Sequence, residues 1–315
     1  GEMFKQALEL DPMSSVMRVN MGNYLRHIGQ LEEAEATVRE VIRLDPGFAS
    51  AYGALARIAR NRGLYDQELR WQAKLVELDP GQISGWARLM WTYMTLGETA
   101  PFDGIRQRVE AIDDQNPALG WVDGYRTMYA DQPAAALEHL DWIYQKLGAD
   151  PFMYRFKGYM YNHMRNFERA RTAWEISDPE FFDRARWREG IEDKAEQGCR
   201  VADILIRTGD EETGLALLQE ALDYLENELP RYIEHADRWG IEDCYLASGQ
   251  YDRAMDAIEK RVEHGHGFGW FFMRKEPQFE PLWGTPRFEA VWQQIQDDLV
   301  GQRERAATIT AELGL

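Results

Sequence analysis

One tripeptide returns at a constant interval near the start of the chain. Leu-Asp-Pro ends at Pro12, Pro46 and Pro80, so these prolines recur with a constant period of about 34 residues. Proline ends a helix because it has no amide hydrogen to donate and because it forces the preceding residue out of the α region. A helix therefore ends at the same place in each unit, and this predicts an array of similar units.

A second break divides each unit. Gly29, Gly63 and Gly97 recur with the same period as the prolines, and glycine suits the left-handed conformation that often follows a helix. Each unit thus predicts two helices, which in the first unit lie near residues 15–28 and 31–44. The second of them has apolar residues at a helical spacing, namely Leu31, Ala34, Val38, Val41 and Ile42.

These units resemble tetratricopeptide repeats. The residues that carry the resemblance are Met21-Gly22, Leu25, Ala34 and Pro46 in the first unit, Tyr52, Leu55-Ala56, Ala59 and Pro80 in the second, and Trp86, Leu89 and Tyr93 in the third. Glu68 departs from the pattern, because the family has a small residue there. The resemblance implies an all-α fold, a right-handed α-α superhelix whose first helices line a concave groove and whose second helices form the outer surface.

The period becomes irregular near residues 98–118 and 176–186, where the prolines no longer keep this interval. Clearer units follow, and we expect a continuous array of about seven to eight helix pairs over residues 1–264. Residues 2–10 match a second helix without its first. The first pair is therefore incomplete, which predicts either a piece of a longer protein or an unusual cap.

The chain changes character at Gly265. Residues 265–315 contain a bulky segment, three prolines and a last helix whose apolar face begins at Phe288 and turns polar after Leu299. This pattern predicts a C-terminal capping helix. The tail also resembles the one that closes tetratricopeptide arrays in bacterial multidomain signalling proteins, through Phe279-Glu280-Pro281-Leu282-Trp283 and Pro286-Arg287-Phe288.

Composition and missing motifs argue against several functions. The net charge of −18 opposes nucleic-acid binding, and no apolar run is long enough for membrane insertion. No phosphate-binding loop, nucleophile elbow or zinc-protease motif occurs, so we expect neither an enzyme nor a cofactor. An enzyme on a helical scaffold stays the alternative, which a cleft collecting histidines and carboxylates would favour.

Cysteines and histidines give little sign of a site. Cys199 and Cys244 are too few for a disulfide framework, and neither lies in a CxxC motif, so we expect a reducing, cytoplasmic compartment. His264 and His266 stand beside Glu263, but their spacing does not share a helix face and no third ligand follows. We therefore expect no metal site.

The charges are unevenly distributed. Residues 13–31, 47–65 and 81–97, which contain the first three first helices, hold arginines but no Asp or Glu, and acidic residues crowd onto the second helices. Residues 153–166 repeat the bias. One interpretation is a basic groove in an acidic molecule. The other is that these arginines pair with acidic residues of neighbouring second helices, since surface ion pairs need no functional cause.

The groove interpretation assigns the partner-binding residues. Counted in the period of the family, the groove-facing positions are Asn23, Arg26, His27, Arg57, Arg60, Asn61, Arg88 and Trp91. Guanidinium groups bind carboxylates and phosphates in a fork geometry, and a tryptophan offers an apolar anchor. The family's clamp for chaperone tails is not matched, because Val19, Ala54 and Ser84 stand where it has Lys, Asn and Lys.

The sequence thus predicts a scaffold or adaptor that binds an acidic peptide or partner segment in its concave groove. The alternative is a regulatory or sensor repeat domain of a larger bacterial signalling protein, such as a cyclase or a transcription regulator. The partner, the pathway and the existence of a homo-oligomer are left open.

Overall fold

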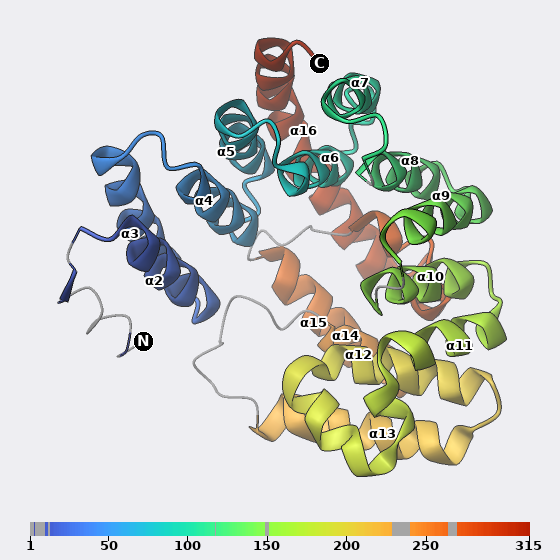
Figure 1. Cartoon of the computed structure of the whole chain (residues 1–315). Helices are drawn as coiled ribbons and strands as arrows, with labels where there is room; N and C mark the ends of the chain where they lie inside the picture. Colours follow the sequence, from blue (N-terminus) through green and yellow to red (C-terminus); the bar gives the residue numbers. More distant parts are fainter. Residues whose placement is uncertain are drawn as a thin grey trace.

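The computed structural model describes residues 13–116, 118–148, 151–228, 240–263 and 270–315, together with Met3, Leu10 and Asp11. Helices follow one another in pairs and stack into a curved array (Figure 1). Seven pairs lie within the described residues: α2 Ser15–His27 with α3 Leu31–Leu44, α4 Ala49–Asn61 with α5 Tyr65–Leu78, α6 Ile83–Leu96 with α7 Phe102–Ile112, α8 Ala118–Tyr129 with α9 Pro133–Leu147, α10 Pro151–His163 with α11 Phe167–Ser177, α12 Trp187–Arg207 with α13 Glu211–Asp223, and α14 Ile241–Ala247 with α15 Tyr251–Glu263.

Shorter elements and a long last helix complete the described chain. They are the 3₁₀ turns η1 Pro179–Phe182, η2 Arg184–Arg186, η5 Trp270–Phe272 and η6 Pro277–Leu282, the π turn η3 Tyr224–Glu228, and α16 Pro286–Leu313. No strand occurs among the described residues. The expected all-α superhelix with a C-terminal helix is confirmed.

The glycine breaks act as the sequence predicts. Gly29, Gly63 and Gly97 adopt φ values of 79°, 69° and 76° between the two helices of their pairs. Asp131 and Arg165 adopt the same left-handed conformation in the next two turns, with φ values of 62° and 56°. All five positions follow one another at one constant interval. The period therefore continues through the segment where the proline spacing becomes irregular, although no glycine marks it there.

Close packing at the family positions joins the helices of a pair. A Cβ atom on Gly22 would lie 2.4 Å from Val38 Cγ2, so α2 and α3 approach each other at a distance that only glycine allows. In the third pair, Trp86 and Tyr93 are 4% and 1% exposed. The Trp86 indole also donates a hydrogen bond of 2.9 Å to the Pro80 carbonyl, which ties α6 to the preceding loop.

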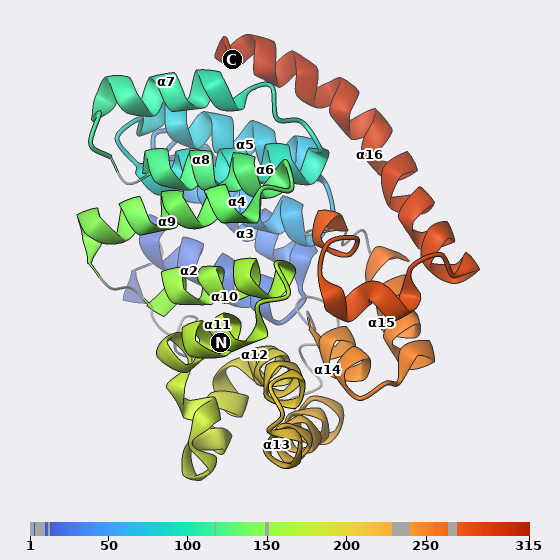
Figure 2. The ribbon, with the colours of Figure 1, turned by 90° about the vertical axis from the view of Figure 1, so that its right-hand side faces the viewer.

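The last helix, α16, leaves α15 and runs obliquely past the ends of the earlier helices to α7 (Figure 2). Its main neighbour in the array is α5. Gln302 Oε1 accepts a hydrogen bond of 2.6 Å from the Tyr65 amide, and Gln302 Nε2 donates one of 2.9 Å to the Gly63 carbonyl. This side chain thereby satisfies backbone groups at the start of α5, where a helix lacks its own partners.

The inward face of α16 is longer than the sequence suggests. Burial does not end at Leu299, because Gln302, Ala306 and Ile309 are 8%, 1% and 2% exposed. The expected change to a polar face is wrong, since the C-terminal half of the helix packs on α5 and not into solvent. Residues of the array and of the tail share one hydrophobic core, so the boundary between 1–264 and 265–315 stays a prediction.

Several expected features lie outside the described residues. They are the helix expected at 2–10 apart from Met3 and Leu10, the proline break at Pro117, and His264, Gly265 and His266 of the segment weighed as a metal site. Among the described residues, no group of three or more histidine, cysteine or acidic side chains could hold a metal ion. None of the helices described is long and apolar enough to cross a membrane.

Candidate partner-binding groove

The predicted groove residues come from the first helices of the first three pairs. α2 carries Asn23 and Arg26, α4 carries Arg57 and Arg60, and α6 carries Arg88. Asn23 and Arg57 stand one period apart, and the Arg57 guanidinium donates a hydrogen bond of 3.1 Å to the Asn23 side-chain oxygen. The repeat therefore brings equivalent positions of adjacent pairs into direct contact.

Further polar contacts connect α2 and α4. Arg26 Nη2 and His27 Nε2 lie 2.8 Å apart. With its amide turned to satisfy both neighbours, Asn61 accepts a hydrogen bond of 3.2 Å from Arg26 and donates one of 3.0 Å to the Arg57 carbonyl. Arg26 and Asn61 are buried, whereas His27 is exposed at the end of α2. The guanidinium of Arg26 is therefore held in place before any ligand arrives.

Four arginines of these first helices hold positive charges close to one another. Burial lowers the pKa of Arg57 to about 10, and the positive charges of Arg88, Arg26 and Arg60 act in the same direction. The pKa of Arg88 is lowered as well, by desolvation of its guanidinium and by the charge of Arg60. A guanidinium loses basicity when it is desolvated beside other cations. We call Arg26, Arg57, Arg60 and Arg88 the arginine cluster.

One carboxyl group lies under the arginine cluster. Glu68 of α5 is 1% exposed, and its Oε1 lies 3.7 Å from Arg60 Nε. Burial raises the pKa of Glu68 to about 7, although Arg60, Arg88 and a hydrogen bond from Thr92 act in the opposite direction. At neutral pH this carboxyl group is only partly ionised and neutralises less than one positive charge. Glu68, which stands where the family has a small residue, is thus buried against the first helices.

The ion-pair interpretation holds for some of the basic residues. Arg62 pairs with Glu35 across α3 and α4. Arg155 Nη2 lies 2.6 Å from Asp178 Oδ1, and Lys157 Nζ lies 2.5 Å from Asp141 Oδ1. These pairs, together with the pair between Arg165 and Glu280, account for the basic bias of residues 153–166.

Arg57 and Arg88 differ from these residues. Among the described residues, no carboxylate lies within 4.0 Å of either guanidinium. Arg88 is exposed and Arg57 is half-buried. Pairing with second-helix acids therefore does not explain the positions of these two arginines, and their role in a groove stays a prediction.

Trp91 occupies a different environment from the one expected of an open anchor. Its ring centroid lies 4.9 Å from that of Tyr125, 6.1 Å from that of Phe271 and 6.4 Å from that of Phe272. The last two residues belong to the C-terminal tail, so the tail covers this part of the concave face. Trp91 helps to hold the tail on α6 and α8.

Beside Trp91 lies a cavity of about 280 Å³, which the sequence does not predict. Its aromatic walls are Trp91, Phe156, Tyr159, Phe272 and Phe279, and its charged walls are Glu196, Arg200, Glu242, Asp243, Arg261 and Glu276. Cavities of this kind are at the lower end of the range for small-molecule sites. The charged side chains, however, largely satisfy one another.

A buried ion network crosses this cavity wall. Arg200 Nε lies 2.8 Å from Asp243 Oδ2, and Arg200 Nη1 donates a hydrogen bond of 2.8 Å to Glu276. Gln278 donates one of 2.6 Å to the other oxygen of Asp243. Burial raises the pKa of Asp243 to about 7. The positive charge of Arg200 lowers this pKa, whereas the negative charges of Glu242 and Glu276 raise it further. The network joins α12, α14 and the tail.

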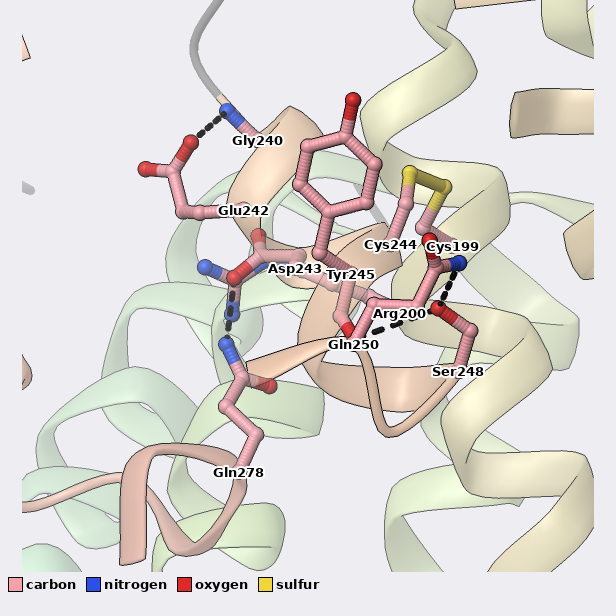
Figure 3. The surroundings of a disulfide bond; sticks show 10 residues. All are labelled: Cys199, Arg200, Gly240, Glu242, Asp243, Cys244, Tyr245, Ser248, Gln250 and Gln278. Carbon is pink, nitrogen blue, oxygen red and sulfur yellow. Dashed lines mark hydrogen bonds and ion pairs between the residues drawn. A yellow bond between two sulfur atoms is a disulfide. The ribbon is translucent and has the colours of Figure 1, made fainter. Parts of the chain in front are cut away.

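A disulfide stands directly beside the network (Figure 3). Cys199 of α12 and Cys244 of α14 are bonded with their Cα atoms 4.9 Å apart, and both are 0% exposed. Cys199 directly precedes Arg200 and Cys244 directly follows Asp243 in the sequence. This adjacency is the one feature of the sequence that could have indicated the contact between α12 and α14. Disulfides persist in oxidising compartments. The cysteines thus no longer support a reducing compartment, and a cytoplasmic location stays a prediction.

Comparison with known proteins identifies the repeat. Residues 17–48, which contain most of α2 and all of α3, match the family model described as tetratricopeptide repeat. This segment is similar to a tetratricopeptide repeat. Small glutamine-rich tetratricopeptide repeat-containing protein 2 of Mycosarcoma maydis is 32% identical over 79 residues, which are 25% of this chain and 22% of that protein. The chain thus matches less than a quarter of the length of that relative, which is fungal, and a bacterial origin is not established.

Comparison with solved structures bears on the arrangement of the helices. The crystal structure of the APC/C hetero-tetramer Cut9-Hcn1 matches with a TM-score of 0.54 at 17% identity, over 80% of this chain and 45% of that chain. A tetratricopeptide repeat protein from Parabacteroides merdae matches with a TM-score of 0.43 at 14% identity, over 95% of this chain and 99% of that chain. The first match supports the tetratricopeptide-type solenoid fold, and at such identities a likeness extends no further than the fold.

Proposed function

We propose that the chain is an interaction scaffold that binds an acidic segment of a partner protein at the arginine cluster. The observation that carries the proposal is the position of Arg57 and Arg88. In a chain of net charge −18, these two guanidinium groups, on α4 and α6, have no described carboxylate within 4.0 Å. Surface arginines in an acidic protein readily find internal partners, so this arrangement favours an external anion.

Energetics support the same conclusion. Burial and three neighbouring arginines lower the pKa of Arg57 to about 10, which means that the folded protein disfavours its charged form. A bound carboxylate would offset this cost, because it brings an opposite charge to the place where like charges meet. Asn23 already orients the Arg57 guanidinium, so little side-chain entropy is lost on binding.

The tail restricts where a partner segment would lie. Trp270 donates a hydrogen bond of 2.7 Å to the Thr95 carbonyl at the end of α6, and Lys275 donates one of 2.7 Å to the Tyr129 carbonyl at the end of α8. His163 of α10 contacts the Lys275 carbonyl at 2.7 Å. The tail therefore occupies the middle of the array, and the proposed site uses α2, α4 and α6.

The test is a binding titration of the whole chain with a fluorescein-labelled peptide of twelve residues rich in Glu. Each fork contact is worth about 1.5–3 kcal/mol because it involves charged groups. The double substitution Arg57→Glu/Arg88→Glu is therefore expected to weaken binding about 100-fold or more. Binding of the unchanged chain is expected to fall as salt rises from 0.1 to 1 M, as the Debye length shrinks from about 10 to about 3 Å.

The matched control is Glu33→Arg. Glu33 is exposed on α3, the second helix of the first pair, so this substitution changes the net charge without touching the cluster. Equal binding by the unchanged chain and the double variant, with both folded by circular dichroism, would contradict the proposal. A control that lowers affinity as much as the double variant would also contradict it.

A regulatory role in a larger signalling protein is the second candidate. It is favoured by the tail, whose residues 279–288 resemble those of signalling proteins and whose helix α16 connects α15 to α5. Arg305 Nε lies 2.6 Å from Asp66 Oδ2 on α5, and α5 also carries Glu68, which pairs with Arg60 of the arginine cluster. Helix α5 therefore contacts both α16 and the cluster. The test is hydrogen exchange of α16 with and without the acidic peptide. No change in α16 would count against this role.

A further inference from the structure

The composition of the arginine cluster indicates which kind of anion it would bind, and not only that its ligand is negatively charged. Its basic members are all arginines and none is a lysine. Arg26, Arg57, Arg60 and Arg88 come from three successive first helices. Burial lowers the pKa values of Arg57 and Arg88, and the charges of neighbouring arginines act in the same direction. The described groups that act on Arg88 include one carboxyl, Glu68. Arg57 and Arg88, for which no carboxylate lies within 4.0 Å among the described residues, therefore bring two positive charges to the cluster.

A single carboxylate does not match these positive charges. It carries one negative charge and two oxygens in one plane, which suffice for one guanidinium fork. A phosphoryl group on a side chain carries a charge of about −1.5 to −2 at neutral pH and three acceptor oxygens directed away from one another. It can therefore receive donors from more than one helix at once, and Arg57 lies on α4 whereas Arg88 lies on α6.

The side chains around the arginine cluster also favour a small dianion as ligand over a long peptide segment with many acidic residues. Trp91, the expected apolar anchor, packs against Tyr125 and the tail, so affinity must come from charge concentrated at one point. Asn23 orients Arg57, and Asn61 contacts both Arg26 and the backbone of Arg57. Such preorganised forks gain most from a ligand whose oxygens they reach together.

We propose that the group recognised at the arginine cluster is a phosphoryl group, carried on a phosphorylated side chain of the partner segment. This inference rests on the proposed function, of which it names the ligand chemistry. Arg57 and Arg88 would supply the principal forks. Arg26 and Arg60 would add the positive field, and Glu68 beneath them would stay buried.

The experiment compares four labelled peptides of twelve residues with one Gly/Ala/Ser background, titrated against the whole chain. Their central residue is serine, phosphoserine, glutamate or a pair of glutamates. The phosphoserine peptide is expected to bind about tenfold or more tighter than the paired-glutamate peptide. Inorganic phosphate is expected to compete at millimolar concentration, and vesicles of phosphatidylcholine with 5% phosphatidylinositol 4-phosphate are expected not to bind.

The variants test the fork geometry. Arg88→Lys keeps the charge but loses the fork, and it is expected to reduce the preference for phosphoserine about threefold or more. Arg88→Gln is expected to abolish the preference, and its circular dichroism spectrum is compared with that of the unchanged chain to show that it is folded. The control Arg62→Gln removes an arginine that is paired with Glu35, and the preference is expected to remain.

The outcomes separate this inference from the proposed function. Equal affinity for phosphoserine and paired glutamates would overturn the inference and leave the acidic-segment proposal standing. Binding of the vesicles without binding of the phosphoserine peptide would overturn it in favour of a lipid headgroup. Failure of every acidic and phosphorylated peptide to bind would overturn both.

Discussion

The packing of α16 against α5 depends on one buried side-chain amide, that of Gln302. Gln302 is 8% exposed. Its side chain accepts hydrogen bonds of 2.6 and 3.3 Å from the Tyr65 and Asp66 amides and donates one of 2.9 Å to the Gly63 carbonyl. The substitution Gln302→Ala removes all three bonds and leaves backbone groups at the α4–α5 turn without a partner.

The cost follows from these contacts. A lost hydrogen bond removes about 1 kcal/mol, and a buried group left unsatisfied costs about 1–3 kcal/mol. Because water can enter part of the vacated space, we expect a decrease of about 2–4 kcal/mol in the free energy of unfolding of this region. The assay is native-state hydrogen exchange at the Tyr65 amide, whose protection reports local opening.

The same helix provides the control. Gln293 is exposed, and its side chain donates a hydrogen bond of 2.8 Å to Asp297 one turn later. Gln293→Ala is expected to change the free energy by about 0.5 kcal/mol or less. Unchanged protection of the Tyr65 amide in Gln302→Ala, or equal losses in both variants, would refute the reasoning and would show that α16 is held by its apolar face alone.

Three further predictions concern stability. Trp86→Ala is expected to cost about 3–5 kcal/mol as a buried aromatic truncation, measured as a lower urea midpoint; Trp283→Ala, which removes a 38% exposed indole, should cost clearly less. The 45-residue separation of Cys199 and Cys244 implies about 4 kcal/mol of stabilisation by their bond in the chain-entropy account, so reduction should lower the midpoint, and an unchanged midpoint would contradict this. Burial raises the pKa of Glu68 to about 7, above its unfolded value, so between about pH 4.5 and 7 the folded state binds a proton that the unfolded state has lost, and the protein loses stability as pH rises through that window. The free energy of unfolding of Glu68→Gln should therefore match that of the unchanged chain at pH 5 and exceed it by roughly 2–3 kcal/mol at pH 8. A constant difference between the two chains across this pH range would count against the raised pKa of Glu68.

Sequence reasoning succeeded where local chemistry repeats. Proline and glycine act on their own backbone, so Pro46 and Gly29 mark helix ends wherever the rest of the chain goes. The repeat period then places Asn23 and Arg57 at equivalent positions, and their hydrogen bond follows from it. The fold class and the neighbourhood of the groove arginines could both be predicted for this reason. Whether Arg57 and Arg88 bind a partner stays a prediction.

Contacts between distant segments could not be predicted in this way. Gln302 meets Tyr65 across 237 positions, Trp91 packs against Phe271 of the tail, and Cys199 pairs with Cys244. Each contact depends on the curvature that accumulates over several helix pairs, because a small rotation at every pair decides which surfaces finally meet. The sequence by itself determined the repeating unit and the side of each helix that carries arginine. Only the tertiary structure decided that the tail would return over the array, since no local residue pattern encodes where a superhelix closes.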